Sequence, residues 1–137
     1  LRHWELLDAI AQASSWSLSK MTSSGLAQLS WSFATLGVPK QELMAAIALQ
    51  VAPQVGGMSE ADLATVAWSF ASLRLRHGRL MHSIAKEAAS RIADFDEEDL
   101  ARLAWAYATL DLAPPELTRL LVEEAGKRAA PSRGPSP

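Results

Sequence analysis

The sequence predicts an all-α protein, an α-solenoid of stacked antiparallel helical hairpins. Two observations predict this fold. One stretch of sequence occurs three times, and the helices that it predicts carry apolar residues on more than one side. The period between the copies is 37 residues, and they read LAQLSWSFATL at 26–36, LATVAWSFASL at 63–73 and LARLAWAYATL at 100–110. A fixed period in this range is typical of helical repeats. We expect about three and a half repeats and seven helices.

Residues 1–18 form the first expected helix. Leu6 and Ile10 lie one period before Leu43 and Ile47. This segment is therefore the second helix of a repeat whose first helix is missing. We interpret it as a half repeat, either a fragment of a longer array or a degenerate cap.

The first helices of the three full repeats each begin at a polar residue. An oxygen of such a side chain accepts a hydrogen bond from a free amide of the first turn. The equivalent N-cap residues are Thr22, Ser59 and Asp96. The helices that they predict span about 22–36, 59–73 and 96–110.

The ends of the first helices differ in sequence. Gly37 follows the first of them, where a left-handed residue commonly ends a helix. Its equivalents, Arg74 and Asp111, are not glycine. We therefore do not expect the three repeats to share this C-cap.

The second helices are expected at about 40–55, 78–93 and 115–129. Pro39 and the pair Pro114–Pro115 stand at helix starts, where a missing amide hydrogen costs little. Pro53 is expected to end or bend its helix. The predicted domain organisation is a repeat array over 1–129 with full repeats at 22–55, 59–93 and 96–129, followed by a disordered tail over 130–137.

Helix 59–73 is apolar over well over half of its surface, so helices must pack on both of its sides. Small residues at equivalent positions allow the neighbouring helices to approach closely. These residues are Ala27, Ala34, Ala64, Ala71, Ala101 and Ala108.

Composition narrows the function classes. The chain has no cysteine, which removes disulfides and thiolate metal sites. No apolar run reaches the length of about 18 residues that a membrane span needs, so we expect no membrane insertion. The net charge of −2 gives no overall attraction to nucleic acid.

The motif L-A-x-x-x-W-x-[FY]-A-[ST]-L with its 37-residue spacing resembles the heptatricopeptide repeat. The resemblance covers about residues 1–129, and related repeats occur in octotricopeptide and FAST-kinase-like proteins. It implies a protein of an organelle that acts on RNA, often in mitochondria, in RNA processing or within a mitochondrial ribosome.

A repeat protein that reads RNA needs polar side chains on one exposed stripe of its first helices. Positions related by the 37-residue period form three rows that contain the candidate RNA-binding residues. The alternative is that these small polar residues only solubilise the helix face. The rows are Gln28, Thr65 and Arg102; Ser32, Ser69 and Ala106; and Thr35, Ser72 and Thr109.

The repeated tryptophans, Trp31, Trp68 and Trp105, have two interpretations. Exposed indoles stack on nucleic-acid bases. Apolar positions at helical spacing more commonly fill a core, and we expect these tryptophans to be buried between hairpins.

The basic residues Arg74, Arg76, His77 and Arg79 cluster at the turn between two helices. Such a cluster suits a phosphate backbone, and the three arginines are RNA-binding candidates. The alternative is a solvated turn without a ligand.

The run Asp96, Glu97, Glu98 and Asp99 stands at a helix start, where acidic residues interact favourably with the helix dipole. We prefer that account to a metal site. No catalytic triad, phosphate-binding glycine loop or zinc-ligand spacing is present in the sequence. We expect no enzymatic activity, no metal, no cofactor and no small-molecule substrate.

Two functions remain. The first is a helical-repeat protein that contacts RNA, single-stranded or ribosomal, in a mitochondrion or alternatively a plastid, together with other protein subunits. The second is a scaffold subunit of an organellar complex without RNA contact.

Overall fold

The computed structural model describes residues 18, 20–37 and 41–129. These ranges contain six α-helices and no strand, which confirms the all-α class. Seven helices were predicted; the one expected over 1–18 lies outside the described residues, apart from Leu18, as does the tail over 130–137. The helices are α2 (Ser23–Leu36), α3 (Gln41–Val51), α4 (Glu60–Ser72), α5 (Gly78–Ser90), α6 (Glu97–Leu110) and α7 (Pro115–Ala129).

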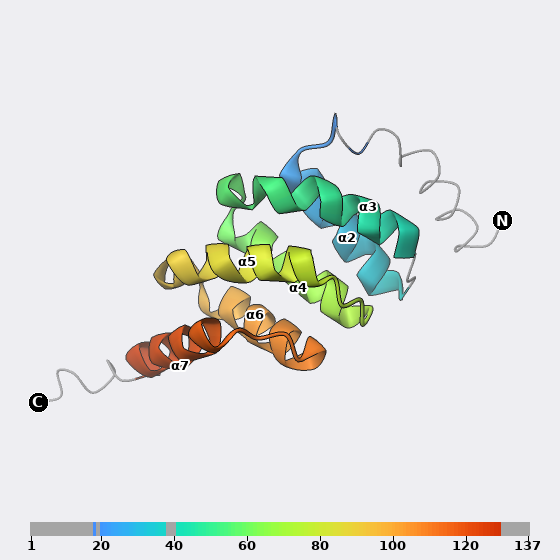
Figure 1. Cartoon of the computed structure of the whole chain (residues 1–137). Coiled ribbons are helices and arrows are strands. Elements are labelled where there is room, and N and C mark those ends of the chain that lie inside the picture. Colours follow the sequence, from blue (N-terminus) through green and yellow to red (C-terminus); the bar gives the residue numbers. More distant parts are fainter. Residues whose placement is uncertain (1–17, 19, 38–40, 130–137) are drawn as a thin grey trace, which may run out of the picture.

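The helices form two rows (Figure 1). The first helices α2, α4 and α6 lie side by side in one row, and α4 packs against both of its neighbours. The second helices α3, α5 and α7 form the other row in front of them. Each first helix also packs against the second helix that follows it. The connections run along both ends of the rows.

Each first helix begins at the N-cap that the sequence predicts. The Thr22 hydroxyl accepts from the amide of Gly25 at 3.0 Å, and the Ser59 hydroxyl accepts from that of Asp62 at 3.1 Å. The Asp96 carboxylate accepts from the amide of Asp99 at 2.8 Å. The local hydrogen bonds thus define the same helix start in every repeat.

The C-caps are more alike than the sequence predicts. Gly37 has φ 69°, as expected for a left-handed residue. Arg74 and Asp111 also have positive φ, 59° and 55°. The C-cap of α4 is Leu73, with φ −89°, and Arg74 follows it. The prediction that the C-cap is not shared is therefore wrong for Asp111, and the left-handed residue recurs at the equivalent position in all three repeats. Side chains other than glycine adopt it at a cost of about 1–2 kcal/mol.

Pro53 ends its helix as predicted. Helix α3 stops at Val51, and the chain continues in the 3₁₀-helix η2 over Ala52–Gly57. A shorter 3₁₀-helix, η3 over Ile92–Asp94, follows α5 at the equivalent place. Both connect a second helix to the next N-cap.

The core lies between the two rows. Its largest members include equivalent aromatic residues of the first helices, Phe33, Phe70 and Tyr107, all of them buried. The Tyr107 hydroxyl donates to the Met81 carbonyl of α5. Because each repeat buries an aromatic ring at the same position of its first helix, the hairpins share one packing pattern.

Two equivalent arginines join consecutive repeats. The Arg91 guanidinium donates to the carbonyls of Val55 and Met58 at 3.1 and 2.6 Å, and to the Glu60 carboxylate at 2.8 Å. Its Nε lies 3.2 Å from the Glu87 carboxylate, without hydrogen-bond geometry.

Arg128, one period later, repeats this arrangement. It donates to the carbonyls of Ala93 and Phe95 and pairs with Glu124. Arg91 thereby satisfies carbonyls of the connection that leads into α4, and Arg128 satisfies carbonyls of the connection that leads into α6.

Within the described ranges, no helix has both the length and the apolar character that crossing a membrane requires.

Replacing Arg91 with alanine is expected to lower the free energy of unfolding by about 2–3 kcal/mol, because charged hydrogen bonds to two carbonyls and a carboxylate are lost. Urea unfolding followed by circular dichroism measures this change. Arg119→Ala is the control: its pair with Glu123 is exposed, and its loss costs about 0–0.5 kcal/mol. Equal effects of the two substitutions contradict the joining role of Arg91.

Burial raises the pKa of the Tyr107 hydroxyl above its ordinary value. The native state therefore keeps this proton above about pH 10, where an unfolded tyrosine loses it. Stability is expected to fall by about 1.4 kcal/mol per pH unit there. The Tyr107→Phe protein, which carries the phenylalanine of the other two repeats, should lack this component of the alkaline loss. Urea titrations at pH 8 to 11 compare the two, and identical pH dependence refutes the assignment.

Candidate functional site

An exposed stripe runs across the first helices, and the tryptophans lie on it. On each helix, three positions spaced three and then four residues apart share one face. None of these residues is buried. They are Gln28, Trp31 and Thr35 on α2; Thr65, Trp68 and Ser72 on α4; and Arg102, Trp105 and Thr109 on α6.

The prediction that the tryptophans are buried is wrong. Trp31 is 47 % exposed and Trp105 is 43 % exposed, while Trp68 is partly buried. The rings of Trp68 and Trp105 lie 6.5 Å apart between centroids and are tilted by 36°. The indoles of α4 and α6 therefore form one aromatic surface that bridges two repeats.

The alanines beside each tryptophan explain this placement. Ala64 and Ala71 of α4 are fully buried. Alanines at the contact bring adjacent helices too close for an indole to fit between them, so the ring lies over the seam. The sequence contained this signal, since an alanine precedes each tryptophan by four residues and another follows it by three.

The predicted row of Ser32, Ser69 and Ala106 does not lie on the stripe. Ser69 is fully buried, and its hydroxyl donates to the Thr65 carbonyl at 2.7 Å. Ala106 is buried too, and Ser32 is only partly exposed. On α4 and α6 this row faces the preceding first helix instead, because one helical position moves a side chain by about 100°.

Arg102 lies on the stripe, but acidic neighbours engage its charge. Its guanidinium pairs with Glu98 and Asp99, each at 3.1 Å. The pKa of Asp99 is raised, first by burial and then by the charge of Asp96, while Arg102 partly opposes the shift. Arg102 is thus the weakest phosphate-binding candidate of the predicted arginines.

The turn that follows α4 presents the remaining predicted arginines. Arg74 donates to the Ala71 carbonyl at 3.2 Å, and its guanidinium carbon lies 5.9 Å from the centre of a Trp105 ring. Arg76 and Arg79 are exposed, and no described residue forms an ion pair with either. The stacking of Arg74 on Trp105 places this basic turn next to the tryptophan row.

A pocket of about 300 Å³ adjoins the basic turn. Arg74, Arg76 and His77 line one wall, and residues of α3 line the other. The Nδ1 atom of His77 is buried there without a hydrogen-bond partner. The exposed Arg76 guanidinium and the His77 imidazole therefore stand at one hollow without a described ion-pair partner for Arg76.

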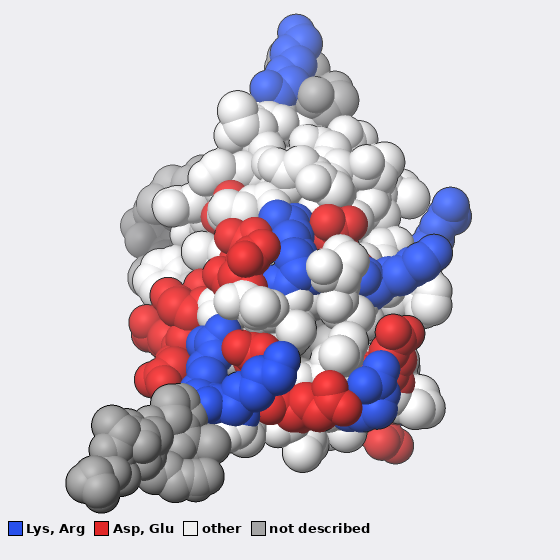
Figure 2. All heavy atoms as spheres, turned by 90° about the vertical axis from the view of Figure 1, so that its left-hand side faces the viewer, with Lys and Arg blue, Asp and Glu red and all other residues white. Residues whose placement is uncertain are grey.

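The opposite end of the helix rows has mixed charge. Figure 2 looks onto this end and shows lysine and arginine interleaved with aspartate and glutamate. Its arginines are paired, as Arg91 with Glu60 and Arg128 with Glu124 show. Because these pairs neutralise the charge locally, the basic turn is the stronger candidate for anion contact.

The acidic run at the start of α6 acts as the sequence predicts, with Asp96 as the N-cap. Across the described ranges, no group of three or more histidine, cysteine, aspartate or glutamate side chains has the arrangement of a metal site.

A family model described as RNA-editing substrate-binding complex 6 protein matches residues 3–130, a range that includes every described helix. Neither a curated protein nor a solved structure matches the chain. The family description does not mention the heptatricopeptide repeat, and that finer assignment stays a prediction. The chain belongs to the RNA-editing substrate-binding complex 6 protein family.

Proposed function

We propose that this chain is a non-enzymatic subunit of an RNA-editing substrate-binding complex and contacts single-stranded RNA there. The family description supports the complex and the theme of RNA processing, but not a ribosome. The observation that carries RNA contact is the exposed tryptophan row beside arginines without acidic partners.

The tryptophan row suits RNA bases. Bases of single strands stack on exposed aromatic side chains, whatever their sequence. Hydrogen-bonding side chains flank each indole three residues before and four residues after it. They are Gln28, Thr35, Thr65, Ser72 and Thr109. Such groups reach the edges of bases that stack on the indoles.

The basic turn suits the backbone of the same strand. Arg76 and Arg79 are exposed and have no described acidic partner, so they offer their full charge to phosphates. Arg74 links the two surfaces by its position over Trp105. A strand whose bases stack along the row therefore has cations beside it at the end of α4, and one of them, Arg74, reaches Trp105 of α6.

The finer architecture that we propose is an α-solenoid of heptatricopeptide type. The equivalent N-caps, the left-handed residues Gly37, Arg74 and Asp111 and the equivalent core aromatic residues support it. We also propose a mitochondrial location, with a plastid as the alternative, since the resemblance implies an organelle that processes RNA. A scaffold role within the complex is the second candidate, favoured by an exposed alanine face on α6.

Reversing the charge of the basic turn, with Arg76→Glu and Arg79→Glu together, is expected to weaken binding of a fluorescent single-stranded RNA by at least about tenfold. The slope of log affinity against log salt should fall by about 1.4, since each phosphate contact on a single strand contributes about 0.7. Fluorescence anisotropy at several salt concentrations measures both.

The matched control for the basic turn is Arg119→Glu with Lys127→Glu, which changes the net charge equally on α7. Affinity should change little in this control. If the control loses as much affinity as the turn variant, or if neither does, the basic turn is not the phosphate site.

Replacing Trp31 with alanine is expected to weaken RNA binding by about 5- to 100-fold, because stacking of a base on an aromatic ring contributes about 1–3 kcal/mol. The salt slope should stay unchanged, since no charge is removed. Trp31→Phe, which keeps a ring, should retain most of the affinity. Anisotropy titrations test this order, and circular dichroism confirms that each variant is folded. Unchanged affinity of a folded Trp31→Ala protein argues against base stacking at this row.

A further inference from the structure

Helix α6, the first helix of the third repeat, exposes a face that is buried on the first helices α2 and α4. Three small residues of each first helix occupy equivalent positions along this face. On α2 and α4 they are all buried: Ala27, Ser30, Ala34, Ala64, Ala67 and Ala71. On α6 the equivalents Ala101, Ala104 and Ala108 are all exposed. Because α2 packs against α4, and α4 against α6, this face is the one that receives the next first helix.

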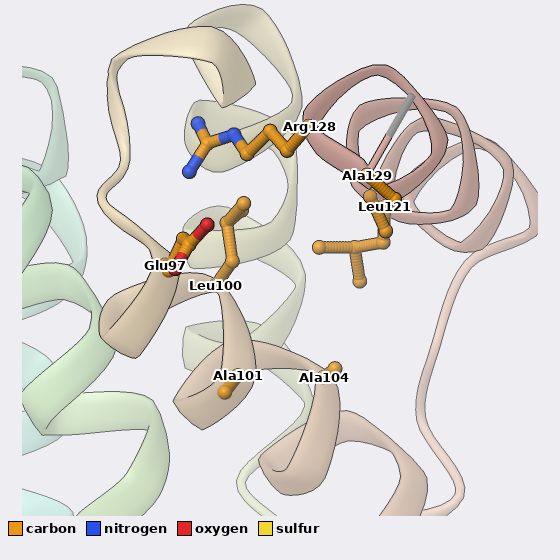
Figure 3. A pocket seen from close by; sticks show the side chains of 8 residues that line it. Glu97, Leu100, Ala101, Ala104, Leu121, Arg128 and Ala129 are labelled. Carbon is orange, nitrogen blue, oxygen red and sulfur yellow. The ribbon is translucent and has the colours of Figure 1, made fainter. Parts of the chain in front are cut away.

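The same end of α7 is also open. Leu121 is partly exposed, and Val122 is 67 % exposed. Their equivalents on α5, Ile84 and Ala85, are buried. A groove of about 370 Å³ lies between the two helices at this end, with Leu100, Ala101 and Ala104 of α6 on one side and Leu121 and Ala125 of α7 on the other. Figure 3 shows the alanines of α6 and Leu121 of α7 facing this space.

At the other end of the three first helices, α2 carries the side chains that would pack against such a face. On α4, Val66 and Ser69 are fully buried and Leu73 is partly buried, and on α6 the equivalents Leu103, Ala106 and Leu110 are buried. These side chains lie on the side of each helix that faces the preceding first helix. The α2 equivalents are open: Leu29 and Ser32 are partly exposed, and Leu36 is 45 % exposed.

We infer that copies of this chain associate head to tail, with the α6–α7 end of one copy receiving the α2 end of the next. The chain contains both halves of the contact, and each is a third copy of a surface that is buried twice within the same chain. The new interface therefore continues the packing of α2 on α4 and of α4 on α6. A contact between different surfaces of identical chains is heterologous, so it extends to longer assemblies. The inference does not depend on RNA contact.

The experiment uses the full chain and two glutamate substitutions, Ala104→Glu at the α6 end and Leu36→Glu at the α2 end. Analytical ultracentrifugation measures mass over a range of concentrations. The unchanged chain should gain mass beyond the monomer as its concentration rises. Each variant alone should stay at the monomer mass, because a buried unpaired carboxylate opposes the contact.

An equimolar mixture of the two variants distinguishes a head-to-tail contact from a contact between identical surfaces. The Ala104→Glu protein keeps its α2 end and the Leu36→Glu protein keeps its α6 end, so the mixture should form a dimer and stop there. Leu49→Glu is the matched control: Leu49 is 65 % exposed, and its equivalents Lys86 and Glu123 are charged and exposed. This control should assemble like the unchanged chain.

Three results overturn the inference. The first is an unchanged chain that stays monomeric up to about 100 μM, a concentration well above the range of ordinary specific contacts. The second is a mixture of variants that stays monomeric although the unchanged chain associates, which indicates a contact between identical surfaces. The third is a loss of association in the Leu49→Glu control equal to that in the end variants.

Discussion

The close contact between successive first helices determines the rest of the structure. Ala64, Ala67 and Ala71 are fully buried at the side of α4 that receives α6. Side chains this small bring helix backbones near one another, and the partner fills the remaining space with larger residues such as Leu103. A single hairpin cannot bury this face alone, so stability requires neighbours in register.

The same contact produces the surface on which the proposed function depends. On α4 the alanines pack closely against the neighbouring helix, and Trp68 lies beside Trp105 of α6. Trp31, Trp68 and Trp105 are all at least partly open to solvent. Their spacing is then set by helix packing and not by loop conformation. An aromatic row that rigid elements hold needs little ordering when a ligand binds, which favours affinity. The exposure of these rings is therefore a consequence of the fold that suits stacking.

The sequence predicts the features that depend on local hydrogen bonds and on the period, and it misses those that depend on which side a neighbour approaches. The N-caps at Ser59 and Asp96 follow from one side chain and one amide, and both are confirmed. The position of Ser69 depends on whether α2 covers it, and a hydrophobic pattern that surrounds most of the helix does not specify that side. The carbonyl contacts of Arg91 link residues more than 30 positions apart, so no local pattern predicts them.

The left-handed Arg74 and the open faces of α2 and α6 both affect the surface that is available to RNA. A left-handed arginine costs about 1–2 kcal/mol where glycine is free of strain. In this conformation the Arg74 guanidinium lies over the ring of Trp105 on α6. If copies join head to tail, Trp105 of one copy lies next to Trp31 of the following copy, as Trp68 lies next to Trp105 within the chain. The tryptophan row then continues across the interface. Assembly would lengthen the surface for single-stranded RNA beyond what three repeats provide, so RNA and self-association would each favour the other.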